Sequence, residues 1–243
     1  MKKTYALLAI AAVVVLVAYA LLPSREFREE VFPLAEGVTL DKYDDRSDGG
    51  SSEAELKLSE SAAVFSCTLG ADTTKSAWCG LLWNFDPKND EDFRNWTFVD
   101  TVFLEVEATG IGEAIMKVWT FDPDVTDIGK PASFKLLLKE FPLKAGAQRV
   151  AIPMEQFYTP DFWYETAGVD KKYNKRHQET VARVEIVPGW NHPRGKPFTL
   201  TVKNVVAIGV SNLYFGIVLI AFILFTIIAV GLRHKTGHNE GED

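Results

Sequence analysis

Two uncharged, strongly apolar segments lie near the two ends of this chain of 243 residues. Residues 5–22 read YALLAIAAVVVLVAYALL, and residues 213–232 read LYFGIVLIAFILFTIIAVGL. Each is close to the about 20 apolar residues that an α-helix needs to cross the hydrocarbon core of a bilayer. We therefore predict a transmembrane helix or signal anchor over residues 1–22 and a second transmembrane helix over residues 212–232.

The basic residues beside these segments predict their orientation. Lys2 and Lys3 precede the first segment, and the basic run RHK at residues 233–235 follows the second. Lys and Arg next to a membrane span mark the cytoplasmic side, so both termini are predicted to be cytoplasmic, with residues 233–243 as a short tail. The region between the spans then lies on the far side, in the periplasm of a bacterial inner membrane.

The first segment has a second interpretation as a cleavable signal peptide. Ala18, Tyr19 and Ala20 fit the small-x-small pattern that precedes a cleavage site. The apolar run continues through Leu21 and Leu22 without a polar break, which favours an uncleaved anchor. Under either interpretation the central region is exported.

The charge of the chain bears on its partners. The formal net charge is −7 and the pI is near 5.2. Nucleic-acid binding needs a basic surface that neutralises phosphates, so we predict no nucleic-acid partner. A membrane, a glycan or a protein of the cell envelope remain as partners.

The central region reads as a stalk followed by a β-sandwich. Residues 23–37 carry mixed charge and two prolines without clear periodicity, which predicts a stalk. Over residues 38–211, short apolar and polar alternations are separated by Gly, Pro, Asp and Asn, which is typical of an all-β sandwich or barrel. In residues 101–107 (TVFLEVE) and 181–187 (VARVEIV), the alternation gives one apolar core face and one polar face.

Other short segments complete the predicted sandwich. Further candidate strands are residues 55–58, 63–69, 77–85, 114–121, 134–141, 148–152 and 198–208. About ten strands at this spacing favour a two-sheet sandwich over a repeat protein or a parallel sheet. Residues 90–96 and 160–167 are the best candidates for short helices.

The only two cysteines, Cys67 and Cys79, both lie in the exported region. An oxidising compartment favours a disulfide between them. By alternation Cys67 shares a face with Phe65 and Leu69, and two strands joined by a short connection could be adjacent and bring the thiols within reach. The alternative is two buried thiols that act as small hydrophobic groups.

Four segments together resemble a known superfamily, and the likeness extends over residues 39–209. The segments are YDDRSDGGSS (43–52), WCGLLW (78–83), VARVEIVPG (181–189) and FTLTVKNVVAIG (198–209). Their order and spacing resemble the galactose-binding-like jelly rolls, and within them the family 11 carbohydrate-binding modules. More weakly, the first segment is similar to the opening of the complex I intermediate-associated family.

The resemblance implies a jelly roll with one concave sheet that presents aromatic and polar side chains to a glycan. Sugar rings have apolar faces that stack on aromatic rings, while their hydroxyls need polar partners. The candidate ligand-binding residues are Trp78, Lys117, Trp119, Trp163, Tyr164, Arg183 and Glu185. Each has a plainer interpretation, since a Trp in a sandwich is more often core and an Arg–Glu pair is more often solvated. Few of the seven tyrosines align with the tyrosines that line the family's groove.

Three aspartates at the start of the domain allow a metal site. Asp44, Asp45 and Asp48 crowd into one loop, and carboxylates suit a hard cation such as calcium. The resemblance also implies a structural calcium near the first strand. The alternative is a turn in which Asp, Ser and Gly supply bends and local hydrogen bonds. No cofactor is required under either interpretation.

The histidines offer no catalytic arrangement. His177 and His192 lie in charged, loop-like stretches without a Ser or Cys nucleophile motif nearby, and His234 and His238 lie in the predicted tail. A pair of carboxylates of the glycosidase type stays open, because Asp and Glu are plentiful. We predict that the protein is not an enzyme.

These observations predict a membrane-anchored, extracytoplasmic ligand-binding module that is either carbohydrate-binding or sensory. Only residues 233–243 follow the second span, too few to fold as an output domain. The alternative is a structural or assembly protein whose sandwich holds a protein partner in the cell envelope.

Overall fold

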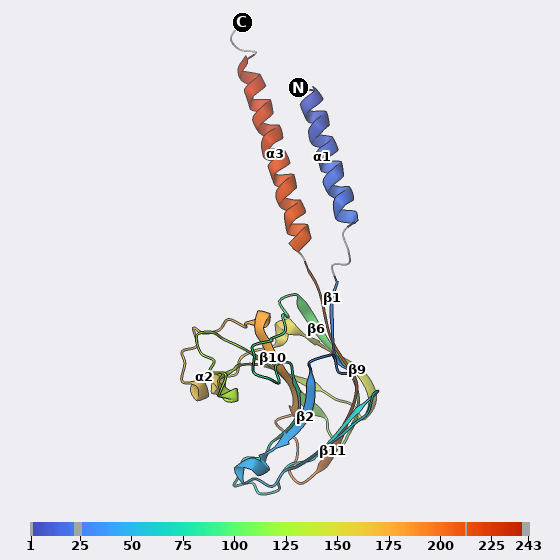
Figure 1. Cartoon of the computed structure of the whole chain (residues 1–243), viewed down its shortest axis with the longest axis vertical. Coiled ribbons are helices and arrows are strands. Elements are labelled where there is room, and N and C mark those ends of the chain that lie inside the picture. Colours follow the sequence, from blue (N-terminus) through green and yellow to red (C-terminus); the bar gives the residue numbers. More distant parts are fainter. Residues whose placement is uncertain (1, 22–25, 212, 240–243) are drawn as a thin grey trace. The chain divides into compact units, whose positions relative to one another are not determined.

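The computed structural model divides the chain into two compact units (Figure 1). The larger unit spans Phe27–Gly209, and the smaller unit holds Met1–Glu26 and Val210–Asp243. The residues described are 2–21, 26–211 and 213–239.

The larger unit contains two sheets of different strand order. Sheet A consists of β1 (Glu26–Phe32), β3 (Glu53–Leu58), β4 (Ala63–Thr68), β6 (Val99–Thr109), β9 (Gly146–Pro153) and β11 (Pro197–Val210). Its order is β3, β4, β11, β6 and β9, and β1 also pairs with β11. Sheet B consists of β2 (Thr39–Asp44), β5 (Cys79–Asn84), β7 (Glu113–Thr120), β8 (Lys135–Pro142) and β10 (Val181–Pro188), in the order β2, β5, β10, β7 and β8.

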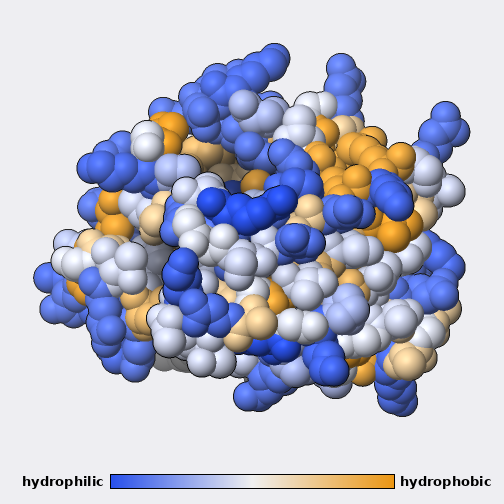
Figure 2. Space-filling view, turned by 90° about the horizontal axis from the view of Figure 1, so that it is seen from below, coloured by the Kyte–Doolittle hydropathy of each residue, from blue (hydrophilic) through white to orange (hydrophobic). Residues whose placement is uncertain are grey.

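The strand pairing confirms the predicted two-sheet jelly-roll sandwich. Strands that are far apart in sequence lie side by side and antiparallel, as β11 does between β4 and β6 and β10 does between β5 and β7. In β6 the alternation predicted from the sequence holds, because Val102, Leu104 and Val106 are buried while Glu105 and Glu107 are exposed. Polar residues cover most of the surface seen from below, and apolar ones gather mainly in one area of it (Figure 2).

The hydrophobic core lies between the two sheets. Its largest fully buried apolar side chains are Phe32, Phe65, Leu81, Trp83, Phe85, Trp96, Phe157 and Phe198. Phe65 of β4 and Phe198 of β11 meet edge to face, with ring centroids 5.9 Å apart. Such aromatic contacts contribute beyond the area that they bury.

The predicted disulfide between Cys67 and Cys79 is present. Cys67 belongs to β4 of sheet A and Cys79 to β5 of sheet B, so the bond joins the two sheets across the core. The prediction that these strands are adjacent was therefore wrong. The two cysteines reach each other because both side chains point inward from facing sheets.

The predicted stalk over residues 23–37 is wrong for the part that forms β1. Val31 and Phe32 are fully buried, and the indole Nε1 of Trp96 donates to Glu29 at 2.9 Å. The strand alternates in burial along EFREEVF, but its charges obscured this pattern in the sequence. The sandwich thus begins before residue 38, while residues 23–25 of the prediction lie outside the described residues.

Helices are short in the sandwich. α2 (Asp161–Ala167) lies within the helix predicted over residues 160–167, and the 3₁₀ turns are η1 (Asp45–Asp48), η2 (Pro131–Ser133), η3 (Met154–Gln156) and η4 (Gln178–Thr180). The helix predicted over residues 90–96 is absent from this segment. Instead, Arg94 exchanges two backbone hydrogen bonds of 2.9 Å with Val181, and this bridge holds the segment extended.

The smaller unit contains two long apolar helices, α1 (Lys2–Ala20) and α3 (Leu213–Asn239). Both are long and apolar enough to cross a membrane, as predicted from the sequence. The two helices contact each other, since the hydroxyl of Tyr5 donates to the carbonyl oxygen of Ala229 at 3.4 Å.

Replacing both Cys67 and Cys79 by Ala should lower the free energy of unfolding by about 3 kcal/mol, because the bond closes a loop in the unfolded chain. The two residues are 12 apart in sequence. Guanidinium unfolding of the full chain in detergent, followed by tryptophan fluorescence, measures the change. Reduction of the native chain should shift its midpoint to that of the variant. An unchanged midpoint would show that the sheets need no covalent tie.

Candidate functional site

The outer face of sheet B, which points away from the core, is partly covered by a second hydrophobic cluster. The cluster consists of Ile115, Leu136, Leu138, Trp163, Tyr164 and Val187. Trp163 and Tyr164 belong to α2 and are only 2% and 8% exposed, and the Trp163 Nε1 donates to the Phe134 carbonyl at 2.7 Å. These two predicted ligand-binding residues therefore pack α2 onto the sheet, and their rings are not open platforms.

Four other predicted residues gather beside this cluster on the same face. In the register of β10 and β7, Arg183 lies opposite Trp119 and Glu185 lies opposite Lys117. The Glu185 carboxylate lies 3.7 Å from Lys117 Nζ and 3.5 Å from Arg183 Nε. Tyr43 of β2 donates its hydroxyl to Glu185 Oε2 at 2.7 Å. We call these five residues the outer-face charge cluster.

The outer-face charge cluster is largely shielded from water. The side chain of Glu185 is 7% exposed and that of Arg183 is 16% exposed. Burial, and then the charge and hydrogen bond of Glu185, raise the pKa of Tyr43 well above its ordinary value. Burial lowers the pKa of Arg183, and Glu185 opposes this effect. The Arg183 guanidinium also covers the ring of Trp119 at 4.5 Å from its centroid, so this ring face is occupied.

A pocket of about 240 Å³ opens next to the charge cluster. Its aromatic and basic lining residues are Tyr43, Trp78, Lys117, Trp190, His192 and Arg194. We call it the aromatic pocket. Of the residues predicted to bind a ligand, Trp78 and Lys117 line this pocket.

Local contacts set the position of Tyr43 and Trp78. Their ring centroids lie 5.7 Å apart. A side chain at Gly80 could not fit, because a Cβ there would lie 2.4 Å from Cζ of Tyr43. The glycine thus lets the tyrosine ring lie across β5. The backbone N–H of Trp78 donates to Asp45 Oδ2 at 3.1 Å.

Trp190 stands at the rim of the aromatic pocket and is 58% exposed. Its Nε1 donates to Glu140 Oε1 at 2.9 Å, and the hydroxyl of Tyr158 donates to the same oxygen at 2.7 Å. Burial and this hydrogen bond raise the pKa of Tyr158 to about 12. Phe162 of α2 meets the indole edge to face, with centroids 6.2 Å apart. The exposed ring is therefore held in one orientation.

His192 and Arg194 come from the loop that follows β10. The His192 ring lies 3.2 Å from the Lys196 carbonyl through Nε2 and packs against Phe198. Arg194 donates through Nη1 to the carbonyls of Asp72 and Lys75. The arginine thus joins this loop to the loop between β4 and β5.

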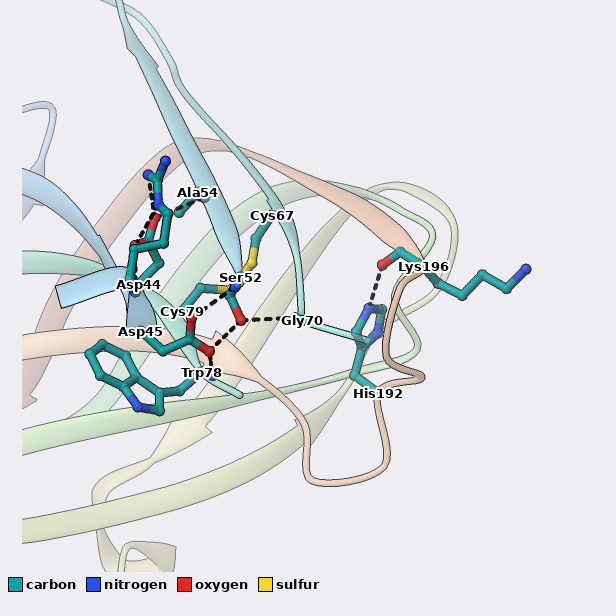
Figure 3. The surroundings of a disulfide bond; sticks show 11 residues. Asp44, Asp45, Ser52, Ala54, Cys67, Gly70, Trp78, Cys79, His192 and Lys196 are labelled. Carbon is teal, nitrogen blue, oxygen red and sulfur yellow. Dashed lines mark hydrogen bonds and ion pairs between the residues drawn. A yellow bond between two sulfur atoms is a disulfide. The ribbon is translucent and has the colours of Figure 1, made fainter. Parts of the chain in front are cut away.

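A buried aspartate organises the same end of the sandwich (Figure 3). Asp45 accepts from the Ser52 backbone at 2.8 Å and from the Ser52 hydroxyl at 2.6 Å, in addition to Trp78. The Ser52 hydroxyl in turn accepts from the N–H of Gly70 at 2.9 Å. Burial alone would raise the pKa of Asp45, but these hydrogen bonds outweigh it and hold its pKa below the ordinary value.

The three aspartates proposed for calcium have separate surroundings. Asp44 binds Arg46 at 2.7 Å, Asp45 binds Ser52, and Asp48 is exposed. Within the described ranges, no group of three acidic, His or Cys side chains is placed to hold a metal ion. The calcium ion stays a prediction that calcium titration can address.

Tyr43, Trp190, His192 and Arg194 were not predicted as ligand-binding residues. Tyr43 directly precedes Asp44 and Asp45, and the sequence pattern there indicates metal binding by the aspartates. The segment around Trp190 reads GWNHPRG and looked like an ordinary charged loop. A bulky aromatic residue between glycine and a basic loop was the one local signal that could have identified it.

Comparisons with known proteins concern the fold alone. No family model matches the chain, and no curated protein matches it. Among solved structures, a family 11 carbohydrate-binding module of a Clostridium thermocellum cellulosomal cellulase is 12% identical, with a TM-score of 0.48, covering 77% of this chain and 96% of the module. The chain is thus similar in fold to a module of the family that its sequence resembles.

Two further structures show the range of proteins with a similar fold. A family 11 module from the same organism in complex with a β-1,3-1,4-mixed-linked tetrasaccharide is 12% identical, with a TM-score of 0.48 and coverage of 78% and 98%. A family 12 xyloglucanase from Bacillus licheniformis is 10% identical, with a TM-score of 0.41 and coverage of 76% and 100%. A fold by itself does not determine function, so function has to be argued from the site.

Replacing Glu185 by Gln should lower the free energy of unfolding by about 3 kcal/mol, because the charges of Lys117 and Arg183 lose their buried partner. The substitution keeps the size of the side chain and an acceptor for Tyr43. Guanidinium unfolding of the full chain in detergent measures the change.

Glu107→Gln is the matched control. Glu107 forms an ion pair with Lys203, and the two side chains are 50% and 49% exposed. Exposed pairs contribute about 0–1 kcal/mol, so this variant should stay close to the native chain. Equal losses in the two variants would contradict a buried charge network on the outer face.

Replacing Asp44 by Asn should weaken the acid sensitivity of the fold. The hydrogen bond from Arg46 lowers the pKa of Asp44 to about 2, below the unfolded value of about 3.9. Its stabilising effect is complete above the unfolded pKa and is lost as pH falls toward 2. The free energy of unfolding of the variant should therefore depend less on pH between about 4 and 2. Equal pH slopes in denaturant titrations would refute this role.

Proposed function

We propose that this protein is a membrane-anchored, extracytoplasmic module that binds a carbohydrate in the aromatic pocket. The observation that carries the proposal is the lining, in which the rings of Tyr43, Trp78 and Trp190 stand beside polar side chains. Sugar rings offer apolar C–H faces to such rings, and their hydroxyls need hydrogen-bonding partners. His192 and Lys117 supply these partners within the same pocket.

The size of the pocket favours one end of a ligand over a whole chain. Its volume of about 240 Å³ is below the about 300 Å³ at which ligand pockets usually begin. One sugar ring is therefore proposed to enter it. Beyond the rim, Phe162 meets Trp190 edge to face, and Tyr158 donates to the same Glu140 oxygen as Trp190. Trp190, Phe162 and Tyr158 are roughly half exposed, at 58%, 45% and 46%. Further sugar units are proposed to lie along these rings.

The two apolar helices support an anchoring role. α1 and α3 are each long and apolar enough to span a bilayer, and basic residues next to both spans favour cytoplasmic ends. The sandwich is then proposed to lie in the periplasm of a bacterial inner membrane, where the disulfide would form. The module is proposed to bind its ligand without catalysing a reaction.

Replacing Trp78 or Trp190 by Ala should weaken glycan binding about tenfold each, since a lost aromatic contact is worth roughly 1 kcal/mol or more. The ligand is first found by affinity electrophoresis of the detergent-solubilised full chain in a panel of polysaccharides. Calorimetry with the retained polysaccharide then gives the affinities.

Phe98→Ala serves as the matched control, because Phe98 is 39% exposed and does not line the aromatic pocket. It should leave the affinity unchanged. Thermal unfolding of all three variants checks that the fold is intact. If no polysaccharide is retained and a stoichiometric envelope protein is crosslinked in native membranes instead, the assembly-protein alternative replaces this proposal.

A further inference from the structure

The charged side chains that line the aromatic pocket are basic. Lys117 and Arg194 line it, and the described residues that line it include no Asp or Glu. The chain as a whole is acidic, with a net charge of −7, so the pocket differs in sign from the average surface. An oriented positive site of this kind attracts anionic ligands over neutral ones.

The buried carboxylate that pairs with Lys117 is shared with a second cation. Glu185 is shared by Lys117, Arg183 and the hydroxyl of Tyr43. Lys117 and Arg183 thus share the single negative charge of Glu185, and the outer-face charge cluster has a net charge of about +1. Glu185 does not line the aromatic pocket.

Arg194 adds a second positive charge that faces no carboxylate within ion-pair distance among the described residues. Its Nη1 binds two backbone carbonyls, of Asp72 and Lys75, which are neutral. The Asp72 carboxylate accepts from the backbone and hydroxyl of Thr74 at 2.9 and 2.6 Å. The two backbone bonds fix the position of the guanidinium. The hydrogen bonds of Thr74, and after them the charges of Lys75 and Arg194, lower the pKa of Asp72, so this carboxylate opposes the charge of Arg194 from beyond ion-pair distance. A planar guanidinium suits a carboxylate, which it can bind through two parallel hydrogen bonds.

From this geometry we infer that the ligand of the aromatic pocket is an acidic carbohydrate, with a uronic-acid carboxylate held between Lys117 and Arg194. The inference rests on the proposed carbohydrate function and names the class of sugar. The rings of Tyr43, Trp78 and Trp190 take the apolar face of the sugar, and the two cations take its carboxylate. With a neutral sugar, Lys117 would keep only the carboxylate of Glu185, which it shares with Arg183.

The test compares acidic polysaccharides with neutral counterparts of the same sugar configuration. The pairs are polygalacturonate and galactan, polymannuronate and mannan, and polyglucuronate and cellulose. Binding of the full chain in detergent is measured by affinity electrophoresis at low and at high salt. In at least one pair the acidic member should bind ten times more tightly or better, and its advantage should shrink with salt because the attraction is screened.

Variants locate the preference within the pocket. Arg194→Gln and Lys117→Gln remove one charge each and retain polar groups, so each should reduce the preference for the acidic member about tenfold. Arg194→Lys keeps the positive charge and should retain most of the preference for the acidic polysaccharide. Lys57→Gln makes the same charge change on a residue outside the pocket and should leave the preference intact.

The outcomes separate this inference from the proposed function. Equal or tighter binding of the neutral members would overturn the acidic-sugar inference and leave carbohydrate binding standing. Binding to no polysaccharide would overturn the proposed function itself. Polyglutamate is a control polyanion that carries carboxylates but no sugar rings. If it bound as tightly as the acidic polysaccharide, general charge attraction would explain the preference, and the inference would be overturned as well.

Discussion

The bond between Cys67 and Cys79 fixes the spacing of the two sheets at the end of the sandwich where the aromatic pocket opens. Trp78 directly precedes Cys79, so its ring position depends on where the bond holds β5. Asp45 completes this arrangement, because it binds the Trp78 backbone and Ser52 at the same time. The pocket is thus built on a covalent tie and a buried hydrogen-bond centre, and Arg194 joins two of the loops that line it.

The outer face of sheet B shows how this chain differs from an open concave sheet. α2 closes one part with Trp163 and Tyr164, and the outer-face charge cluster fills another part around Glu185. Paired charges that are shielded from water are costly to separate, so these side chains hold this part of the face closed. On the same face, open aromatic surface lies beside the cluster, at the aromatic pocket and along Trp190.

Local patterns predicted much of the fold. The period of two in β6 and β10 gave their inner faces correctly, and compartment chemistry gave the right cysteine pair. The sheet partners of those cysteines were missed, because a twelve-residue separation suits a connection within one sheet as well as one between two sheets. β1 was missed because charged residues occupy its exposed positions, and only pairing with β11 reveals it as a strand.

The site was predicted less well than the fold. Alternation placed Lys117 and Trp119 on one face of their strand and Arg183 and Glu185 on one face of theirs, and the pairing of β7 with β10 brings the four together. Whether a Trp is open or covered depends on segments far away in sequence. Trp163 is covered because its own helix folds back onto β8, whereas Trp190 stays open because Glu140 holds it at the surface. No local pattern carries that information.

The two strands at the ends of the sandwich, β1 and β11, are neighbours in sheet A. Each continues along the chain toward one of the two apolar helices. A mechanical load applied through both tethers would therefore be carried by the ladder between these two strands. Sheet B, which holds Tyr43 and Lys117 of the aromatic pocket, lies outside that load path. The aromatic pocket can in this way keep its geometry under such a load.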